Sequence, residues 1–299
     1  MHVLVVGCGW LGAEVARVAA VRGDQVTAVR RDAGRSAALR DLGVALCSLD
    51  VSIPGAASRL PRADAVIACQ SAETGSVAAY RAAYLSVNAE VLSMVARCGA
   101  RMVYTGSTGV FGQADGADVD ESSPPTPASA TAEVLLQAEE SITRAARGGI
   151  HACVLRLSGL YGPGRAGILE RVRSGRLSLG PGDDVWMNFC HRADAVQLAL
   201  AALAQGRPGG TYHGSDEEPT RKGEVVSWVA RALGVSPHRD GAPAEGPSRR
   251  ILSSWTRRTL GVELAYRSFR EGLAPLVEAE LGAKTAPAAL GAALGRSGE

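Results

Sequence analysis

The sequence predicts an α/β fold, a doubly wound parallel sheet with a smaller C-terminal lobe. Apolar segments typical of strands alternate with amphipathic segments typical of helices up to Gly214, which is the pattern of a parallel sheet covered by helices on both faces. The chain also opens with an apolar run, a glycine-rich turn and a helix, the order in which a Rossmann fold begins. Its 299 residues allow one extended core with an added lobe.

The first elements are a strand over residues 2–6, the turn GCGWLG over residues 7–12 and a helix over residues 13–21. Gly7 permits the tight turn, Gly9 lets a pyrophosphate approach the backbone, and Gly12 lets the helix pack closely on the strand. The free N–H groups of a helix N-terminus bind phosphates. We therefore expect a dinucleotide here, with Trp10 and Leu11 among its contacts.

The next strand, over residues 25–29, indicates which dinucleotide binds. It is followed by Arg30 and Arg31, at the place where a carboxylate would bind the ribose 2′-hydroxyl of NAD. A carboxylate repels the 2′-phosphate of NADP, whereas a guanidinium pairs with it bidentately and stacks on adenine. We therefore expect NADP. The alternative is a solvated strand end, and Asp32 beside the arginines favours that alternative.

The remaining elements follow the same alternation. Strands are expected over 64–69, 101–105, 151–157 and 210–214, and helices over 77–98, 131–147 and 193–204, while the prolines of residues 122–127 require a loop. The dinucleotide-binding Rossmann core is thus expected over 1–165, completed by about 189–214, and the substrate lobe over 166–188 and 215–282. Residues 283–299, rich in Ala, Gly and Pro, are expected to form a flexible tail.

Composition excludes several classes of function. A net charge of +2 gives no basic field for nucleic acid, and no apolar run reaches the roughly 20 residues of a membrane span. The chain enters its first strand at once, which leaves no room for a signal peptide. The six cysteines form no CxxC pair, so they are expected to be reduced and buried, without a disulfide or metal. We expect a cytoplasmic protein whose partner is a small-molecule substrate, with no nucleic acid and no membrane.

Further motifs follow the glycine turn in a defined order. They are YTGSTGVFG at 104–112, Glu121 with Pro124 and Pro127, RLSGLYGPG at 156–164, HRAD at 191–194 and FREGL at 269–273. These segments resemble the "SS..VYG", "E..P..P", "R..NVYGPG", "H..D" and "EGL" segments of the extended short-chain dehydrogenases/reductases of the NAD-dependent epimerase/dehydratase family. The resemblance runs from the first strand to about Leu273, and its detail is most similar to the atypical members, which keep the nucleotide half and vary the active site.

The resemblance also implies contacts and an assembly. Asp50 and Val51 resemble the adenine contacts, Ala68 is a further expected cofactor contact, and Asn88 resembles a structural asparagine. Relatives of this kind pair through the two long helices, here 77–98 and 131–147. A homodimer is therefore expected.

The chain departs from the family at the catalytic residues. The family uses Ser or Thr with a Tyr that moves the proton and a Lys that lowers the pKa of that Tyr. Ser107 occupies the Ser position. Counting back from Glu139 puts the Tyr position at about Thr131 and the Lys position at about Leu135. Both partners are absent, so oxidation of alcohols by the usual relay is not expected.

Three candidate catalytic residues follow from position. Ser107 could orient an acceptor, and Thr131 or Tyr161 could donate a proton. Each has a structural alternative: Ser107 as a loop cap, Thr131 as an ordinary helix N-terminal residue, and Tyr161 as a packing residue under the nicotinamide. His191 is expected to be structural, at a helix start.

We therefore expect an NADP(H)-dependent oxidoreductase without the Tyr-x-x-x-Lys relay, which reduces an activated imine or conjugated small organic substrate. Hydride transfer to such a substrate needs little protonation, because the nicotinamide carries the chemistry. The alternatives are a non-redox isomerase or dehydratase and a catalytically silent NADP-binding sensor or partner protein.

The predicted lobe indicates a small substrate. Residues 184–189, just upstream of His191, contain no cation, whereas relatives that handle nucleotide sugars tend to carry a phosphate-gripping Arg there, so a diphosphosugar is disfavoured. An apolar pocket could be lined by Trp186, Met187, Phe189 and Trp255, unless these residues belong to the core. A substrate carboxylate could bind Arg249, Arg250, Arg257 or Arg258, unless these arginines are only exposed.

Overall fold

The computed structural model describes residues 1–239 and 246–285, and its centre is a parallel sheet. Seven strands lie in the order β11-β7-β5-β4-β1-β2-β3. In chain order they are β1 (His2–Val6), β2 (Gln25–Arg30), β3 (Ala45–Ser48), β4 (Ala65–Ala68), β5 (Arg101–Ser107), β7 (Ala152–Leu157) and β11 (Thr211–Gly214). Every pairing in this sheet is parallel. The predicted doubly wound fold is confirmed.

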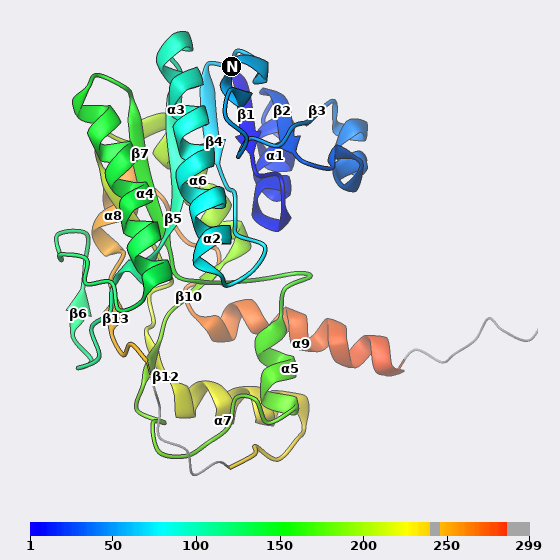
Figure 1. Ribbon diagram of the computed structural model, residues 1–299. Coiled ribbons are helices and arrows are strands. Elements are labelled where there is room, and N and C mark those ends of the chain that lie inside the picture. The colour runs from blue at the N-terminus through cyan, green and yellow to red at the C-terminus, as the bar shows by residue number, and fades with distance from the viewer. Residues whose placement is uncertain (240–245, 286–299) are drawn as a thin grey trace, which may run out of the picture.

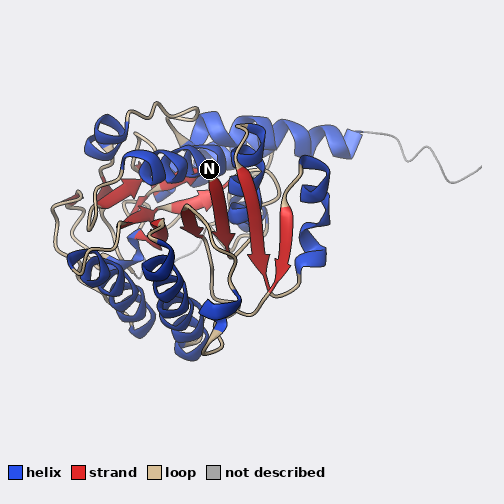
Figure 2. Ribbon diagram, turned by 90° about the horizontal axis from the view of Figure 1, so that it is seen from above, coloured by secondary structure: helices blue, strands red, loops and turns tan. Residues whose placement is uncertain are grey.

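Helices cover both faces of the sheet (Figure 2). On one face, α1 (Trp10–Val21) and α6 (Arg192–Gln205) bury Val15, Ala16 and Leu198 against the strands. On the other face, α3 (Val87–Cys98) and α4 (Ala130–Arg147) bury Met94 and Ile142. The strands between these layers are apolar on both sides, as a doubly covered parallel sheet requires.

The predicted elements agree with the structure apart from their ends and two segments. The helix expected over 77–98 is α2 (Val77–Tyr80), a π-helical segment η3 (Arg81–Ser86) and α3. No element was expected between the strands at 25–29 and 64–69. The structure forms β3 there, with the 3₁₀ segments η1 (Ala33–Leu42) before it and η2 (Ala56–Arg59) after it. Short and polar, these pieces lack the periodicity that identifies the longer elements.

A smaller lobe lies beyond the carboxyl ends of the strands (Figure 1). Helices α5 (Gly167–Arg173), α7 (Lys222–Leu233) and α9 (Phe269–Thr285) form its separate core around Val172, Val229 and Phe269. Three ribbons connect it to the sheet: β8 (Gly159–Tyr161) with β10 (Phe189–His191), β9 (Trp186–Met187) with β12 (Thr220–Arg221), and β6 (Asp118–Val119) with β13 (Arg250–Ile251). The remaining elements are α8 (Ser254–Leu260) and the 3₁₀ turn η4 (Thr108–Val110).

The described chain also bears on the expectations about membrane spans, metal sites, cysteines and the C-terminal tail. Within residues 1–239 and 246–285, no helix has the length and apolar character of a membrane span, and no cluster of His, Cys, Asp and Glu is arranged to hold a metal. All six cysteines are free. The flexible tail expected over 283–299 begins with three residues that end α9, and the rest of it lies outside the described residues.

Candidate functional site

The glycine turn between β1 and α1 is built for close backbone approach. Gly7 has a φ of 82°, and a Cβ on Gly7 would lie 2.4 Å from the backbone N of Gln70. A Cβ on Gly12 would lie 2.5 Å from the carbonyl oxygen of Gly7. Only glycine therefore fits at either position, as the sequence analysis expected.

The N-terminus of α1 is free to bind an anion. Its N-cap is Gly9, no side chain caps it, and its first turn holds no acidic residue. The first N–H groups of a helix have no partner within the helix, so those of Trp10 and Leu11 are available to a pyrophosphate. The Leu11 side chain is buried and does not line the cleft.

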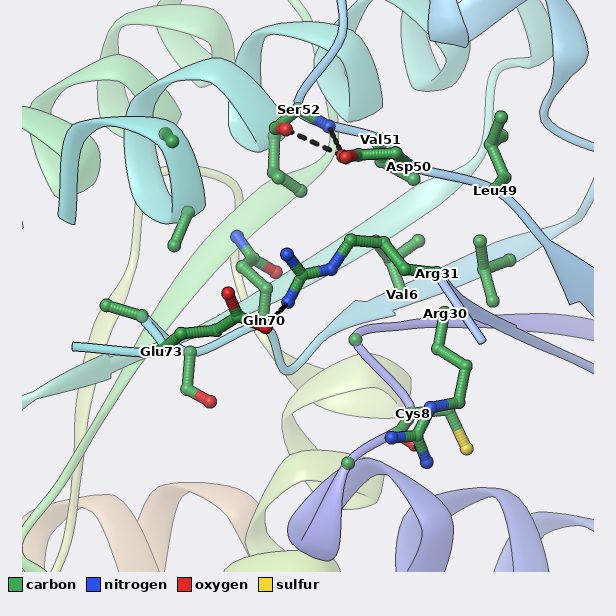
Figure 3. Close-up of a pocket in the computed structure, with 18 of the residues that line it drawn as sticks. Val6, Cys8, Arg30, Arg31, Leu49, Asp50, Val51, Ser52, Gln70 and Glu73 are labelled. Atoms are coloured by element: carbon green, nitrogen blue, oxygen red, sulfur yellow. Dashed lines mark hydrogen bonds and ion pairs between the residues drawn. The ribbon is translucent and has the colours of Figure 1, made fainter. Parts of the chain in front are cut away.

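A cleft of about 380 Å³ begins at this turn and runs across the carboxyl ends of β1, β2 and β4 (Figure 3). Its walls are the glycine turn, the end of β2 with the start of η1, the loop after β3, the loop after β4, and the α2–α3 segment. The lining residues include Gly7, Gly9, Arg30, Arg31, Arg35, Asp50, Val51, Gln70 and Glu73. This is the edge of an open α/β sheet at which nucleotides bind.

The two predicted arginines have different roles in this cleft. Arg30 turns toward the glycine turn, where its Nη1 donates to the Cys8 carbonyl at 2.9 Å and to Ser36 Oγ at 3.0 Å. Arg31 reaches across the cleft and pairs with Glu73 (Figure 3). Arg35, which the sequence analysis missed, also lines the cleft, because η1 turns back toward the end of β2.

Asp50 and Val51 lie in the cleft where the resemblance implied adenine contacts. The Asp50 carboxylate accepts from Ser52 N at 2.9 Å and from Ser52 Oγ at 2.6 Å. The Ser52 hydroxyl is the largest cause that lowers the pKa of Asp50, so this carboxylate stays ionised at neutral pH. It can accept a hydrogen bond from an exocyclic amine.

Ala68 does not reach the cleft. It is fully buried within β4, and its carbonyl accepts from Thr105 Oγ1 at 3.1 Å. Gln70, two residues further on, lines the cleft instead. Its Nε2 donates to Oδ1 of the buried Asn88 at 2.7 Å, and its Oε1 is buried without a partner among the described residues. The pair agrees with the structural role expected for Asn88.

Trp10 does not line the cleft, and its side chain turns instead toward the loop after β8. Its indole Nε1 donates to the Pro163 carbonyl at 2.9 Å. The guanidinium carbons of Arg165 and Arg192 lie 5.3 and 4.8 Å from the centre of a Trp10 ring, which is cation–π distance. The side chain of Trp10 therefore joins the loop after β8 to the start of α1.

Ser107 caps the short turn η4. Its Oγ accepts from Gly109 N at 3.0 Å, which is the structural alternative raised for this residue. A hydroxyl that accepts one hydrogen bond keeps its own proton to donate. Ser107 can therefore cap the turn and still orient an acceptor.

Leu135 occupies the expected lysine position and packs on the same turn. A Cβ on Gly109 would lie 3.7 Å from Leu135 Cδ1 and 3.2 Å from Ser107 Oγ. Leu135 is buried in a small cluster with Val110 and Phe111. The environment of this turn is thus apolar where the family relay would place an amine.

Thr131 lies in the first turn of α4. Its Oγ1 is 3.1 Å from the hydroxyl of Ser129, the N-cap residue of that helix. This is the ordinary helix-start position that the sequence analysis raised as its alternative. No lysine or arginine hydrogen-bonds to Thr131 within the described chain, so its hydroxyl has no partner of the kind that makes the family tyrosine acidic.

The structure does not bring Tyr161 to the other candidates. Its hydroxyl donates to the Ser268 carbonyl at 3.4 Å, and its ring packs against Phe189 and His191. Burial raises the pKa of Tyr161 far above its usual value. Tyr161 is therefore a packing residue in the core of the smaller lobe and does not line the cleft, so the structure does not place it under a nicotinamide as the stated alternative had it.

The other lobe residues named from the sequence lie in different environments. His191 Nδ1 accepts from Ala193 N at 3.2 Å and caps α6, and burial lowers its pKa to about 4, which agrees with a structural role. Phe189 is part of the lobe core. Trp255 is 46 % exposed and stacks on Tyr212. Trp186 lies against the guanidinium groups of Arg221 and Arg250, and Met187 packs on the lobe core. Trp186, Phe189 and Trp255 therefore do not form the expected aromatic pocket together.

Comparisons with known proteins agree with this geometry. The model of the NAD dependent epimerase/dehydratase family matches residues 3–213. A Streptomyces protein named 3-diazoavenalumate denitrifying reductase is 28% identical over 306 residues, which cover 91% of this chain and 99% of that protein. Protein YeeZ of Escherichia coli strain K12 is 29% identical over 277 residues, 88% and 96% of the two chains. The structure of a dTDP-glucose 4,6-dehydratase from Bacillus anthracis in complex with NAD is similar with a TM-score of 0.81 at 16% identity, covering 94% of this chain and 97% of that chain.

Proposed function

The chain belongs to the NAD dependent epimerase/dehydratase family, and we propose that it is an NADPH-dependent reductase of activated small organic substrates. One observation carries the proposal: the cleft at the carboxyl ends of β1, β2 and β4 is followed, at the end of the neighbouring strand β5, by a Ser107 turn on which Leu135 packs where the family relay would have its lysine. The first half of this observation supports binding of a nicotinamide cofactor. The second half selects the kind of substrate.

The residues of the cleft favour the phosphorylated cofactor. Arg31 and Arg35 both line it near Asp50, and their guanidinium groups suit a ribose 2′-phosphate. The present partner of Arg31 is Glu73, whose side chain is 68% exposed. An exposed ion pair is worth about 0–1 kcal/mol, so a phosphate can replace Glu73 readily. NADPH, when bound, supplies the hydride.

The substrate class follows from the proton balance. Reduction of a ketone gives an alkoxide that needs a proton, and Thr131 lacks the neighbouring amine that would make it acidic. An iminium carbon needs only hydride, because its cationic nitrogen takes the C=N electron pair. At a diazonium carbon, hydride forms the new C–H bond and dinitrogen leaves with the C–N electron pair. A conjugated acceptor takes hydride at its β-carbon, and the resulting enolate takes a proton from water.

Two further observations support this class. The Streptomyces relative is by name a denitrifying reductase of a diazo compound. The Ser107 hydroxyl keeps a proton to donate, so it can orient the electrophilic group. Neither hydride transfer to such a substrate nor its orientation by Ser107 requires a phenol or an amine.

The test uses NADPH deuterated at C4 with a cyclic imine, an arenediazonium salt or a conjugated ketone, and acetone as the control. We expect enzyme-dependent loss of reduced-nicotinamide absorbance, and deuterium on the product carbon by mass spectrometry, with at least one activated substrate and not with acetone. Reduction of acetone at a comparable rate would contradict the proposal. Tight NADPH binding without turnover of any of these compounds would favour the silent sensor instead.

A further inference from the structure

Arg249 lies beside the Ser107 turn, and its segment is held there by Asn188, which lies between β9 and β10. Asn188 Nδ2 donates to the Arg249 carbonyl at 2.9 Å, and Asn188 Oδ1 accepts from Ile251 N at 2.7 Å. The Arg249 side chain then extends to η4, where Nη2 donates to the Thr108 carbonyl at 2.8 Å. The Asn188 segment and the turn η4 are distant in sequence. Together they hold the Arg249 guanidinium against Thr108, the residue that follows Ser107.

This guanidinium has no carboxylate partner among residues 1–239 and 246–285, unlike the arginines near it. Arg250 pairs with Asp118 at 2.7 Å, and Arg257 pairs with Glu217. The Nε of Arg249 is buried, and the described residues supply no acceptor for it. Burial also lowers the pKa of Arg249, yet a guanidinium remains charged at any physiological pH. A charge removed from water is costly unless it is paired.

We propose that Arg249 binds a carboxylate of the substrate and that the enzyme acts on small organic acids. The Thr108 carbonyl occupies one of the five N–H donors, and a carboxylate would supply two acceptor oxygens to those that remain. A substrate anchored there extends from Arg249 toward Ser107, on the same turn.

This inference deepens the proposed function and rests on it only for the identity of the Ser107 turn as the reaction site. Its test therefore uses binding and requires no turnover. Calorimetry compares cinnamate, an aromatic carboxylate, with cinnamamide, its uncharged analogue, on protein saturated with NADP⁺. The variants are Arg249→Gln and Arg249→Lys, with Arg250→Gln as the matched control on the next residue, and circular dichroism checks their folding.

We expect the native protein to bind cinnamate roughly 10- to 100-fold more tightly than cinnamamide, the range of a charge-assisted hydrogen bond. Arg249→Gln should remove this difference, Arg249→Lys should keep part of it, and Arg250→Gln should keep all of it. If Arg249→Gln does not fold, the two ligands on the native protein and Arg249→Lys still decide the question.

Equal affinities for the two ligands, or no binding of cinnamate by protein that binds NADP⁺, would overturn the inference. A loss in Arg250→Gln as large as in Arg249→Gln would do the same. A native protein that prefers cinnamate but reduces none of the activated substrates would support the role of Arg249 and refute the proposed reductase.

Discussion

Replacing Arg31 with glutamine is expected to weaken the binding of NADPH and to leave the binding of NADH nearly unchanged. Arg31 projects from the end of β2 across the cleft, and its partner there is Glu73 (Figure 3). Only the phosphorylated cofactor carries a group that can take the place of Glu73. The two cofactors are otherwise identical, so their ratio isolates this contact.

The size of the effect follows from the exposure of the pair. A hydrogen bond to a charged group is worth about 1.5–3 kcal/mol when it is protected from water. The Arg31 side chain is 56% exposed, so solvent screens the contact, and about 0.5–1 kcal/mol is the appropriate range. This range corresponds to a loss of roughly 2- to 5-fold in affinity for NADPH.

The assay is a fluorescence titration of each variant with NADPH and with NADH. Arg40→Gln is the matched control, because Arg40 is an exposed arginine of η1 that does not line the cleft. The preference for NADPH should also shrink as salt is added, since salt screens an exposed charge pair. A native protein that prefers NADH, or an Arg31→Gln protein with an unchanged NADPH to NADH ratio, would refute the assignment of the 2′-phosphate to Arg31.

Three further predictions concern stability and the cleft. Gly7→Ala should abolish NADPH binding and lower the free energy of unfolding by more than Gly23→Ala, because both glycines have positive φ but only Gly7 faces backbone within 4 Å; equal losses in urea unfolding would contradict this. Burial is the largest cause that raises the pKa of Asp216, to about 8, so the folded state binds the extra proton between about pH 4 and 8 and the free energy of unfolding should fall as pH rises through that window. Asp216→Asn should be more stable than the native protein at pH 8 and show a flatter pH profile, and a variant less stable at pH 8 would exclude this reasoning. Glu139→Ala should destabilise the protein by about 3–5 kcal/mol, because it leaves the buried guanidinium of Arg156 unpaired, and a loss below about 1 kcal/mol in urea unfolding would show that this ion pair is not needed.

Local patterns in the sequence were enough to predict the sheet and the turn that begins it. The run of residues 3–6 is apolar at every position, and Gly7, Gly9 and Gly12 are spaced as the backbone of the turn requires. Such features are properties of neighbouring residues. The fold class and the family were therefore predicted correctly from the chain alone.

The direction of a side chain depends on its packing and could not be predicted in this way. Arg30 and Arg31 are adjacent and chemically identical, yet Arg30 donates to the Cys8 carbonyl and Arg31 reaches across the cleft. Tyr161 belongs to a segment that resembles a motif of the family, but its hydroxyl donates to the carbonyl of Ser268, just before α9 and more than a hundred residues later. Sequence spacing alone contains neither fact.

The sequence by itself determined the parallel sheet, the glycine turn for a dinucleotide and the loss of the tyrosine and lysine relay, because each depends on residue type at short spacing. Only the tertiary structure decided what surrounds the Ser107 turn: Leu135 packs on the turn, and Arg249 donates to its Thr108 carbonyl. These contacts join α4 and the segment before β13 to the end of β5. The folded packing of those three segments sets their distances and leaves the Arg249 guanidinium without a carboxylate partner among the described residues.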